Sequence, residues 1–241
     1  MFSESAEVYD LIYGEFKNYV DESARLAALL RRVNPSCRSV LDVGCGTGEH
    51  MRHLSTHGLR VDGLDLDQRY VDIAARKNPG SRLWRADMVG FDVPERYDAI
   101  VCLFSSIGYV RTLEGMEEAL RTFRRHLEIG GVIVIEPWFA PGQLDPSFVM
   151  RNTAEGHDVR VERVSHLEID GRLSRLRFDY TLTDAVGVRT ATEVHELGLF
   201  TTTEMHRAFQ AVGLEVEHDE SGLDGRGLFI ARVCAGSPSC D

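Results

Sequence analysis

Short apolar runs alternate with amphipathic segments through the first half of the chain. Helix-spaced apolar residues mark segments 19–33, 49–57, 68–77 and 113–127. The strand-length apolar runs lie at 39–43, 60–64, 82–86, 97–103 and 132–135. Strands that alternate with helices predict a mostly parallel sheet with right-handed crossovers. We therefore expect an α/β fold with a Rossmann-like sheet flanked by helices.

The pattern becomes rich in strand formers after Pro137. Three strand-like runs follow, at 158–169, 173–183 and 189–199. Gly171 and Gly187 separate them, and no helical spacing lies between them. This texture predicts an antiparallel meander, inserted at about residues 140–199 into a single domain that spans 1–241.

Alternation in the middle run gives the meander one apolar face. The residues of that face are Leu176, Phe178, Tyr180 and Leu182. An apolar face must cover something, so the meander is expected to act as a lid. Beyond it, Thr201 can cap a helix that runs to about Val212, and strands at 214–218 and 227–233 would complete a seven-stranded sheet.

The composition fits one large globular domain. The 241 residues are 43% hydrophobic and 27% charged, which is enough for a substantial core. The formal net charge of −11 disfavours contact with nucleic-acid phosphates, so no nucleic-acid partner is expected. Every apolar run is far shorter than the roughly 20 residues of a membrane span, so no membrane partner is expected. Residues 1–5 are acidic and lack an apolar signal core, which predicts a cytoplasmic location.

Cysteine and histidine spacing gives no sign of a metal site or a disulfide framework. The five cysteines are Cys37, Cys45, Cys102, Cys234 and Cys240. Their number is odd and no C-x-x-C pair occurs. His50, His53 and His57 recur at helical spacing, but no Cys or carboxylate accompanies them at ligand spacing. We expect reduced thiols and no bound metal.

A glycine-rich loop joins the first strand to the next helix. Residues 41–48 read Leu-Asp-Val-Gly-Cys-Gly-Thr-Gly, and the three glycines would let the backbone approach a ligand. The spacing is G-x-G-x-G rather than G-x-G-x-x-G, and no Lys-Ser/Thr pair follows, which disfavours a pyrophosphate. Asp42 would instead suit a ligand with an ammonium or sulfonium charge.

Two further strand ends offer partners for a nucleoside. Asp65 lies about 20 positions after Gly44, where a carboxylate can bind both hydroxyls of a ribose. The third strand ends at Asp87 and Met88, an acid that can accept from an adenine amine and a thioether that can pack on its ring.

In this order, the loop, Asp65, Asp87-Met88 and Glu136-Pro137 resemble the class I S-adenosylmethionine-dependent methyltransferases over about residues 19–137. The resemblance implies S-adenosylmethionine as cofactor, with Asp42 near its methionine end and Asp65 on its ribose. The candidate cofactor-binding residues are Tyr9, Asp42, Gly44, Cys45, Gly46, Gly48, Asp65, Leu66, Asp87, Met88 and Phe104.

A finer resemblance spans nearly the whole chain. Segments 6–11, 104–109, 136–138 and 225–229 look like those of the N,N-dimethyltransferases that act on TDP-linked amino sugars such as desosamine and mycaminose. It implies N-methylation, in two successive steps, of a TDP-amino sugar in secondary-metabolite biosynthesis. Candidate substrate-binding residues are Tyr19, Ser105, Ser106, Trp138 and Arg226. The resemblance also allows a homodimer, although no residue pattern marks an interface.

Several of these residues have a structural alternative. Tyr9 and Tyr19 would otherwise anchor an N-terminal helix, and Arg226 would pair with one of the many carboxylates. The proton acceptor is also open: the candidate catalytic residues are Tyr109, His166 and Glu136, with His195 as a further base. Tyr ordinarily titrates near pH 10 and Glu near about 4.3, so the amine can equally enter already neutral.

Three other functions remain open. The acceptor is alternatively a peptide N-terminus, a small amine or a natural-product hydroxyl, since the cofactor motifs do not distinguish them. A non-catalytic S-adenosylmethionine-binding module is a further alternative. Hydride transfer with a nicotinamide cofactor ranks below both because of the glycine spacing.

Overall fold

The computed structural model describes residues 6–156 and 158–233. The expectations for residues 1–5, Cys234 and Cys240 therefore concern positions outside the described part of the chain. Within it, Cys37, Cys45 and Cys102 are buried and unbridged. None of the helices in these ranges combines the length and apolarity needed to cross a membrane.

The elements follow one another largely as the sequence predicts. The helices are α1 (Tyr9–Gly14), α2 (Tyr19–Val33), α3 (Glu49–Thr56), α4 (Gln68–Lys77), the 3-10 helix η1 (Ser106–Val110), α5 (Leu113–Arg125) and α6 (Thr202–Ala211). The strands are β1 (Ser39–Val43), β2 (Arg60–Asp65), β3 (Leu83–Arg85), β4 (Tyr97–Cys102), β5 (Leu127–Ile135), β6 (Val149–Glu155), β7 (Val159–Asp170), β8 (Leu173–Asp184), β9 (Gly187–Gly198), β10 (Leu214–Asp219) and β11 (Leu228–Val233).

Seven strands form the main sheet, in the order β10-β11-β5-β4-β1-β2-β3. Strands β1 to β5 pair in parallel, and β11 pairs antiparallel with both β5 and β10. The predicted α/β class is confirmed. Two predicted boundaries are wrong at one junction. The helix expected over 113–127 ends at Arg125, and the strand expected over 132–135 begins at Leu127, which already pairs with Tyr97.

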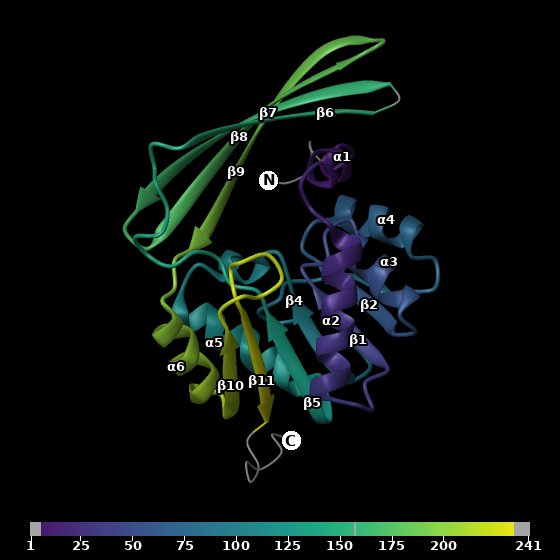
Figure 1. The fold of residues 1–241 in the computed structure, drawn as a ribbon, viewed down its shortest axis with the longest axis vertical. Coiled ribbons are helices and arrows are strands. Elements are labelled where there is room, and N and C mark those ends of the chain that lie inside the picture. Colours follow the sequence, from purple (N-terminus) through teal and green to yellow (C-terminus); the bar gives the residue numbers. More distant parts are fainter. Residues whose placement is uncertain (1–5, 157, 234–241) are drawn as a thin grey trace.

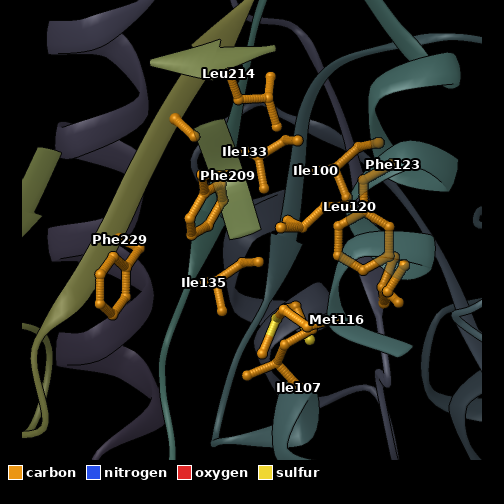
Figure 2. Packing of buried hydrophobic residues seen from close by; sticks show 14 of the residues in the cluster. Ile100, Ile107, Met116, Leu120, Phe123, Ile133, Ile135, Phe209, Leu214 and Phe229 are labelled. Atoms are coloured by element: carbon orange, nitrogen blue, oxygen red, sulfur yellow. The ribbon is translucent and has the colours of Figure 1, made fainter. Parts of the chain in front are cut away.

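The two faces of this sheet bury separate hydrophobic cores. Along β5, Ile133 and Ile135 pack with α5 and α6, whereas Val132 and Val134 pack with α2 and α3. Figure 2 shows the first of these cores, where Phe123 and Phe209 approach the strands. Each fully buried aliphatic or aromatic side chain of this kind contributes about 1.5–3 kcal/mol, so the two cores hold the sheet as a rigid platform.

The remaining strands form a second sheet, β6-β7-β8-β9, which is antiparallel throughout and is called the lid sheet below. It projects beyond the main sheet, above α1 and the ends of the parallel strands (Figure 1). The sequence predicted three strands here and missed β6, because Val149–Glu155 buries little besides Ala154 and shows no apolar alternation.

The apolar face predicted for the middle lid strand is present. Phe178, Tyr180 and Leu182 are buried, and they pack with Val8 and Ile12 of the N-terminal segment. Helix α1 therefore lies between the lid sheet and the main sheet, and it was not predicted as a helix of its own. This arrangement encloses the carboxyl ends of the parallel strands, which is where open α/β sheets bind ligands.

Candidate active site

A cavity of about 920 Å³ lies between the carboxyl edge of the main sheet and the lid sheet. The loops after β1, β2, β3 and β4 line it from one side, and α1 with strands β7 to β9 lines it from the other. Small-molecule sites range from about 300 to 1,000 Å³, so this cavity has room for a cofactor together with a second ligand.

Gly46 is where the glycine-rich loop opens onto this cavity. Its φ is +53°, and a Cβ built there would meet no atom within 4 Å. At Gly44 a Cβ would lie 2.8 Å from Cβ of Ser106, and at Gly48 it would lie 2.5 Å from Nδ2 of Asn78. Neighbouring chain segments therefore require glycine at these two positions, and the prediction that they also make room for a ligand stays a prediction. Gly44 still lines the cavity, whereas Gly48 caps α3 behind it.

Asp65 brings a fixed carboxylate to the cavity at the end of β2. Its Oδ2 accepts a hydrogen bond from the Gly46 N–H at 2.9 Å, and Oδ1 accepts one from the Asp67 N–H at 3.0 Å. Burial raises the pKa of Asp65 above its ordinary value. Each carboxylate oxygen has a second lone pair, so the group can also accept from two vicinal hydroxyls such as those of a ribose.

Asp42 lies behind the loop in β1 and is only 2% exposed. Burial, followed by the charge of Asp65, raises its pKa to about 7. Together with Tyr19 and Cys45, it borders a small cavity of about 40 Å³ beside the loop. Asp65 together with Asp42, which ionises around neutral pH, makes this end of the site negative, and this favours a ligand that carries positive charge.

The side chains predicted to receive an adenine lie beyond Asp65. Asp87 and Met88 line the cavity, as does Leu66, which was predicted only as cofactor-binding, and the Val89 N–H orients Asp87 by donating to its Oδ1 at 3.0 Å. Tyr9 lines the cavity from α1 and contacts the ring of Tyr70 edge-on at 5.4 Å. These positions suit the flat face of a purine and the groups at its edge.

Phe104 and Ser105 occupy the turn after β4 with an unusual backbone. Their φ angles are +50° and +63°, which costs about 1–3 kcal/mol for each non-glycine residue. Two hydrogen bonds hold the turn: the Phe104 N–H donates to Oε2 of Glu136 at 2.5 Å, and the Ser105 hydroxyl donates to the carbonyl of Pro137 at 2.7 Å. The next hydroxyl, of Ser106, reaches the carbonyl of Gly44 at 3.4 Å.

An ion cluster borders the cavity. Its members are Lys17, Glu22, Glu136, Asp224 and Arg226. Lys17 Nζ lies 2.9 Å from Oε2 of Glu22, and Arg226 Nη2 lies 3.1 Å from Oε1 of Glu136. Arg226 Nε also donates to Oδ1 of Asp224 at 3.0 Å, and its Nη1 donates to the Ser105 hydroxyl at 2.9 Å. Arg226 thus borders the cavity and pairs with carboxylates at the same time.

Burial and pairing move the pKa values of the two acids beside Arg226 in opposite directions. Burial raises the pKa of Glu136 to about 7, although the guanidinium opposes the shift. Burial alone would also raise the pKa of Asp224, but its hydrogen bonds with Arg226 hold it well below the usual range. Glu136 is fully buried and is not among the residues that line the cavity, so as a candidate base it has no direct route to a ligand there.

Tyr109 lies in the cavity at the start of a chain of polar contacts. Its hydroxyl is 2.8 Å from Nδ1 of His195, and Nε2 of His195 is 3.5 Å from Oε2 of Glu193. Glu193 and His195 are 1% and 7% exposed, so this acid and this imidazole face the interior from β9. Burial raises the pKa of Tyr109 well above its ordinary value.

The other candidates occupy less enclosed positions. His166 borders the cavity, but its side chain is 39% exposed and its Nε2 lies 3.4 Å from Oδ2 of Asp179. Trp138 borders the cavity and donates from Nε1 to the Ser174 hydroxyl at 2.8 Å. Tyr19 borders only the small cavity, where its ring meets His50 edge-on at 4.9 Å.

Several residues of the site were not predicted from the sequence. They are Tyr13, Lys17, Arg163, Ser165, Glu193 and Asp224. One signal was available, because strict alternation along β7 places Arg163 on the same face as Val161 and Ser165, which makes it a buried charge. Within the described ranges, no group of three or more His, Cys, Asp or Glu side chains is arranged to hold a metal ion.

Comparison with known proteins gives consistent relatives. Residues 40–131 match the family model described as a methyltransferase domain. The chain is 41% identical to the dTDP-3-amino-3,6-dideoxy-alpha-D-glucopyranose N,N-dimethyltransferase of Streptomyces fradiae, over 94% of this chain and 89% of the relative. The crystal structure of DesVI from Streptomyces venezuelae superposes with a TM-score of 0.90 at 37% identity, covering 97% of this chain and all of the other.

A second solved structure carries a cofactor. It is CalS10 from Micromonospora echinaspora, an amino pentose methyltransferase of calicheamicin biosynthesis with S-adenosylmethionine bound. Its TM-score is 0.83 at 36% identity, covering 93% of this chain and 95% of that one.

Proposed function

This chain belongs to the family of S-adenosylmethionine-dependent amino-sugar N,N-dimethyltransferases, and we propose that it methylates the amino group of a TDP-linked amino-deoxysugar, twice in succession. The observation that carries the proposal is the opposition of charge within one cavity. Asp65 and Asp87 line the cavity from the ends of β2 and β3, and Arg226 lines it from the segment before β11. A cationic donor would therefore lie beside the two carboxylates, and an anionic nucleotide sugar beside the guanidinium.

The cofactor end of the cavity fits S-adenosylmethionine. Gly46 leaves open space above the loop, Asp65 offers a carboxylate to ribose hydroxyls, and Met88 offers a soft surface to the base. When bound, the cofactor supplies a methyl group on a positively charged sulfur. The role of the chain at this end is to hold the ribose and the base, and the negative field of Asp42 and Asp65 favours the charged donor over its neutral product.

The acceptor end fits the diphosphate of a nucleotide sugar. Arg226 is held against Ser105 and Glu136 beside the turn of Phe104, so its guanidinium is positioned before a ligand arrives. Strands β7, β8 and β9 of the lid sheet line the cavity and would keep water from the reacting amine. In this proposal residues 1–241 act as one methyltransferase domain, with the lid sheet as its cover, in the tailoring of secondary-metabolite sugars.

The chain also offers a route for the amine proton. An alkyl ammonium must lose a proton before its nitrogen can attack, and after the first transfer the methylated amine must lose another. Tyr109 would accept this proton at its hydroxyl oxygen as its own proton moves to Nδ1 of His195. Glu193 would stabilise the imidazolium that results. Correct approach of the amine supplies much of the remaining rate.

Equilibrium binding separates this function from the alternatives. Titration calorimetry with TDP should show a dissociation constant in the micromolar range, and TDP should raise the melting temperature in proportion to the logarithm of its concentration. A peptide, a small amine or a natural-product phenol should give no comparable shift. Protein that responds to one of these acceptors and ignores TDP would refute the assignment.

A further inference from the structure

Arg163 is a buried cation in the lid sheet with an incomplete set of partners. It is 4% exposed, lies on the inward face of β7 and lines the cavity. Its Nη2 donates to Oδ1 of Asn152 at 3.0 Å, whereas Nε and Nη1 are buried without a hydrogen-bond partner. Among residues 6–156 and 158–233, no carboxylate forms an ion pair with it. A guanidinium in this setting is costly unless an anion joins it.

Two aromatic rings hold the guanidinium in place without neutralising it. Its central carbon lies 5.0 Å from the ring centre of Tyr13 and 4.8 Å from that of Phe178. Ser165, the next residue on the same face of β7, is 9% exposed, and its hydroxyl is also buried without a partner. Two adjacent donors of this kind that line one cavity form a site for an oxygen-rich anion.

Arg163 and Arg226 lie on either side of a pair of rings. Tyr13 and Phe104 meet edge-on at 5.2 Å, with Arg163 over the first ring and Arg226 over the second at 5.1 Å. The two guanidinium groups therefore approach the same part of the cavity, one from the lid sheet and one from the main sheet.

The ion cluster around Arg226 cannot neutralise a dianion by itself. It sets two cations, Lys17 and Arg226, against the three carboxylates of Glu22, Glu136 and Asp224. The other buried acid of the lid sheet, Glu193, pairs with His195 instead. Of the three arginines that line the cavity, Arg111 pairs with Glu196 and Arg226 with Glu136 and Asp224, whereas Arg163 has no carboxylate partner among the described residues.

We propose that Arg163 and Ser165 form an anion-binding subsite in the lid sheet that takes the diphosphate of the nucleotide sugar, opposite Arg226. The inference rests on the proposed function and extends it, because the substrate then joins the lid sheet to the main sheet. An acceptor without a diphosphate leaves Arg163 unneutralised, so the same pair selects nucleotide-linked amines over free ones.

The test compares ligand binding by R163M, R163K and S165A with that of the wild type, using TDP and S-adenosylhomocysteine as separate probes in calorimetry. R163M should weaken TDP binding about 10- to 100-fold, the loss typical of a hydrogen bond to a charged group, and S165A about 2- to 5-fold. R163K keeps the charge and should fall between wild type and R163M. Binding of S-adenosylhomocysteine should stay within twofold in all three.

Thermal unfolding distinguishes a ligand-binding arginine from a structural one. Replacing an arginine that only stabilises the fold would lower the melting temperature of the ligand-free protein. R163M keeps the apolar contacts with Tyr13 and Phe178 and removes a buried charge, so the ligand-free melting temperature should stay level or rise, whereas the shift caused by TDP should shrink. R160M is the matched control, since Arg160 is on the same strand, exposed and paired with Glu155 and Glu162. It should bind both probes as the wild type does.

Three results would overturn the inference. If R163M and R163K bound TDP as tightly as the wild type, the proposed subsite would be refuted. The proposed function would stand, because the wild type would still bind TDP. Loss of S-adenosylhomocysteine affinity alone would assign Arg163 to the carboxylate of the cofactor. Wild-type protein that fails to bind TDP would contradict the proposed function itself, and the diphosphate subsite with it.

Discussion

The hydroxyl of Tyr109 lies 2.8 Å from Nδ1 of His195, although the two residues are 86 positions apart in the chain. One comes from η1 above the main sheet and the other from β9 of the lid sheet. The hydrogen bond therefore links the main domain to the lid sheet and connects a hydroxyl that lines the cavity to a buried imidazole. Neither residue alone suits the removal of a proton from an alkyl ammonium, but together they can share it.

Replacing Tyr109 by Phe should make the reaction more dependent on pH. An alkyl ammonium titrates near pH 10, by analogy with Lys, so at pH 7 the substrate enters protonated and needs the relay. We expect kcat/KM of Y109F and of H195Q to fall about 100-fold at pH 7. The deficit should narrow as the pH approaches 10, because the amine then arrives neutral. Steady-state kinetics from pH 6.5 to 10 measures both the fall in kcat/KM at pH 7 and its decrease at higher pH.

H166Q is the control for this comparison, because His166 is a half-exposed histidine that pairs with Asp179. Its pH profile should match that of the wild type within about twofold. A deficit in Y109F that stays constant across the pH range would assign Tyr109 to positioning alone.

Asp65→Asn should lower the affinity for the cofactor without unfolding the protein. The amide can keep one backbone contact of the carboxylate but cannot accept from two hydroxyls through two oxygens. We expect the dissociation constant for S-adenosylhomocysteine to rise about 10- to 100-fold in calorimetry. The control is D72N, because Asp72 is exposed on α4 and accepts a hydrogen bond from Gln68. D72N should bind S-adenosylhomocysteine as the wild type does. Equal affinity of D65N and wild type would refute the ribose assignment.

Alanine at Gly46 and at Gly44 should have different effects, although both glycines have positive φ. The backbone cost of about 1 kcal/mol applies to each. A methyl group at Gly46 enters the cavity, so G46A should lose affinity for S-adenosylhomocysteine with a modest fall in melting temperature. A methyl group at Gly44 meets Ser106 at 2.8 Å, so G44A should lose more stability. Differential scanning fluorimetry with and without S-adenosylhomocysteine distinguishes the two variants. Equal melting temperatures and equal ligand-induced shifts in G46A and G44A would contradict the geometry.

Asp42→Asn should change how stability depends on pH. The folded-state pKa of Asp42 is raised to about 7, above its unfolded value near 3.9, so the unfolded chain releases this proton first as the pH rises. The free energy of unfolding of the wild type should fall by up to about 4 kcal/mol between pH 4 and pH 8 through this group. D42N removes that fall, so it should match the wild type at pH 4 and exceed it at pH 8 in urea titrations.

The charge of Asp42 also bears on the choice of ligand. D42N should lose more affinity for S-adenosylmethionine than for S-adenosylhomocysteine, because only the former carries a positive sulfur. Equal losses for the two ligands, or a wild-type stability that rises from pH 4 to pH 8 relative to D42N, would contradict this role of Asp42.

The elements with strong local signals could be predicted from the sequence. Helix α4 has the predicted bounds, and Thr201 begins α6 with a capping box to Glu204, both consequences of residues within a few positions of each other. Strand β6 was not predicted because Val149–Glu155 is mostly exposed and shows no alternation of apolar and polar residues. Helix α1 is only six residues long and depends on the lid sheet for its packing.

The site residues also differ in whether local sequence or the tertiary fold determines their position. Asp65 and Gly46 follow a spacing that the strand and turn impose, so the sequence was enough to find them. Arg163 and Glu193 lie in alternating strands, and the alternation of β7 places Arg163 on the buried face, but the contacts with Tyr13 and His195 come from distant segments and do not follow from the sequence. Arg226 was found by resemblance, but its partners Glu136 and Ser105 lie far away in the chain, and only the fold brings them to it.

Turnover of a defined acceptor tests the central claim most directly. The protein is incubated with methyl-labelled S-adenosylmethionine and a TDP-3-amino-3,6-dideoxyhexose, and mass spectrometry follows the sugar nucleotide with time. We predict a monomethylated species that rises and then declines as a dimethylated species accumulates, with two labelled methyl groups per sugar. An unmodified sugar nucleotide across a panel of 3-amino and 4-amino TDP-sugars, from protein that binds S-adenosylmethionine normally, would contradict the account.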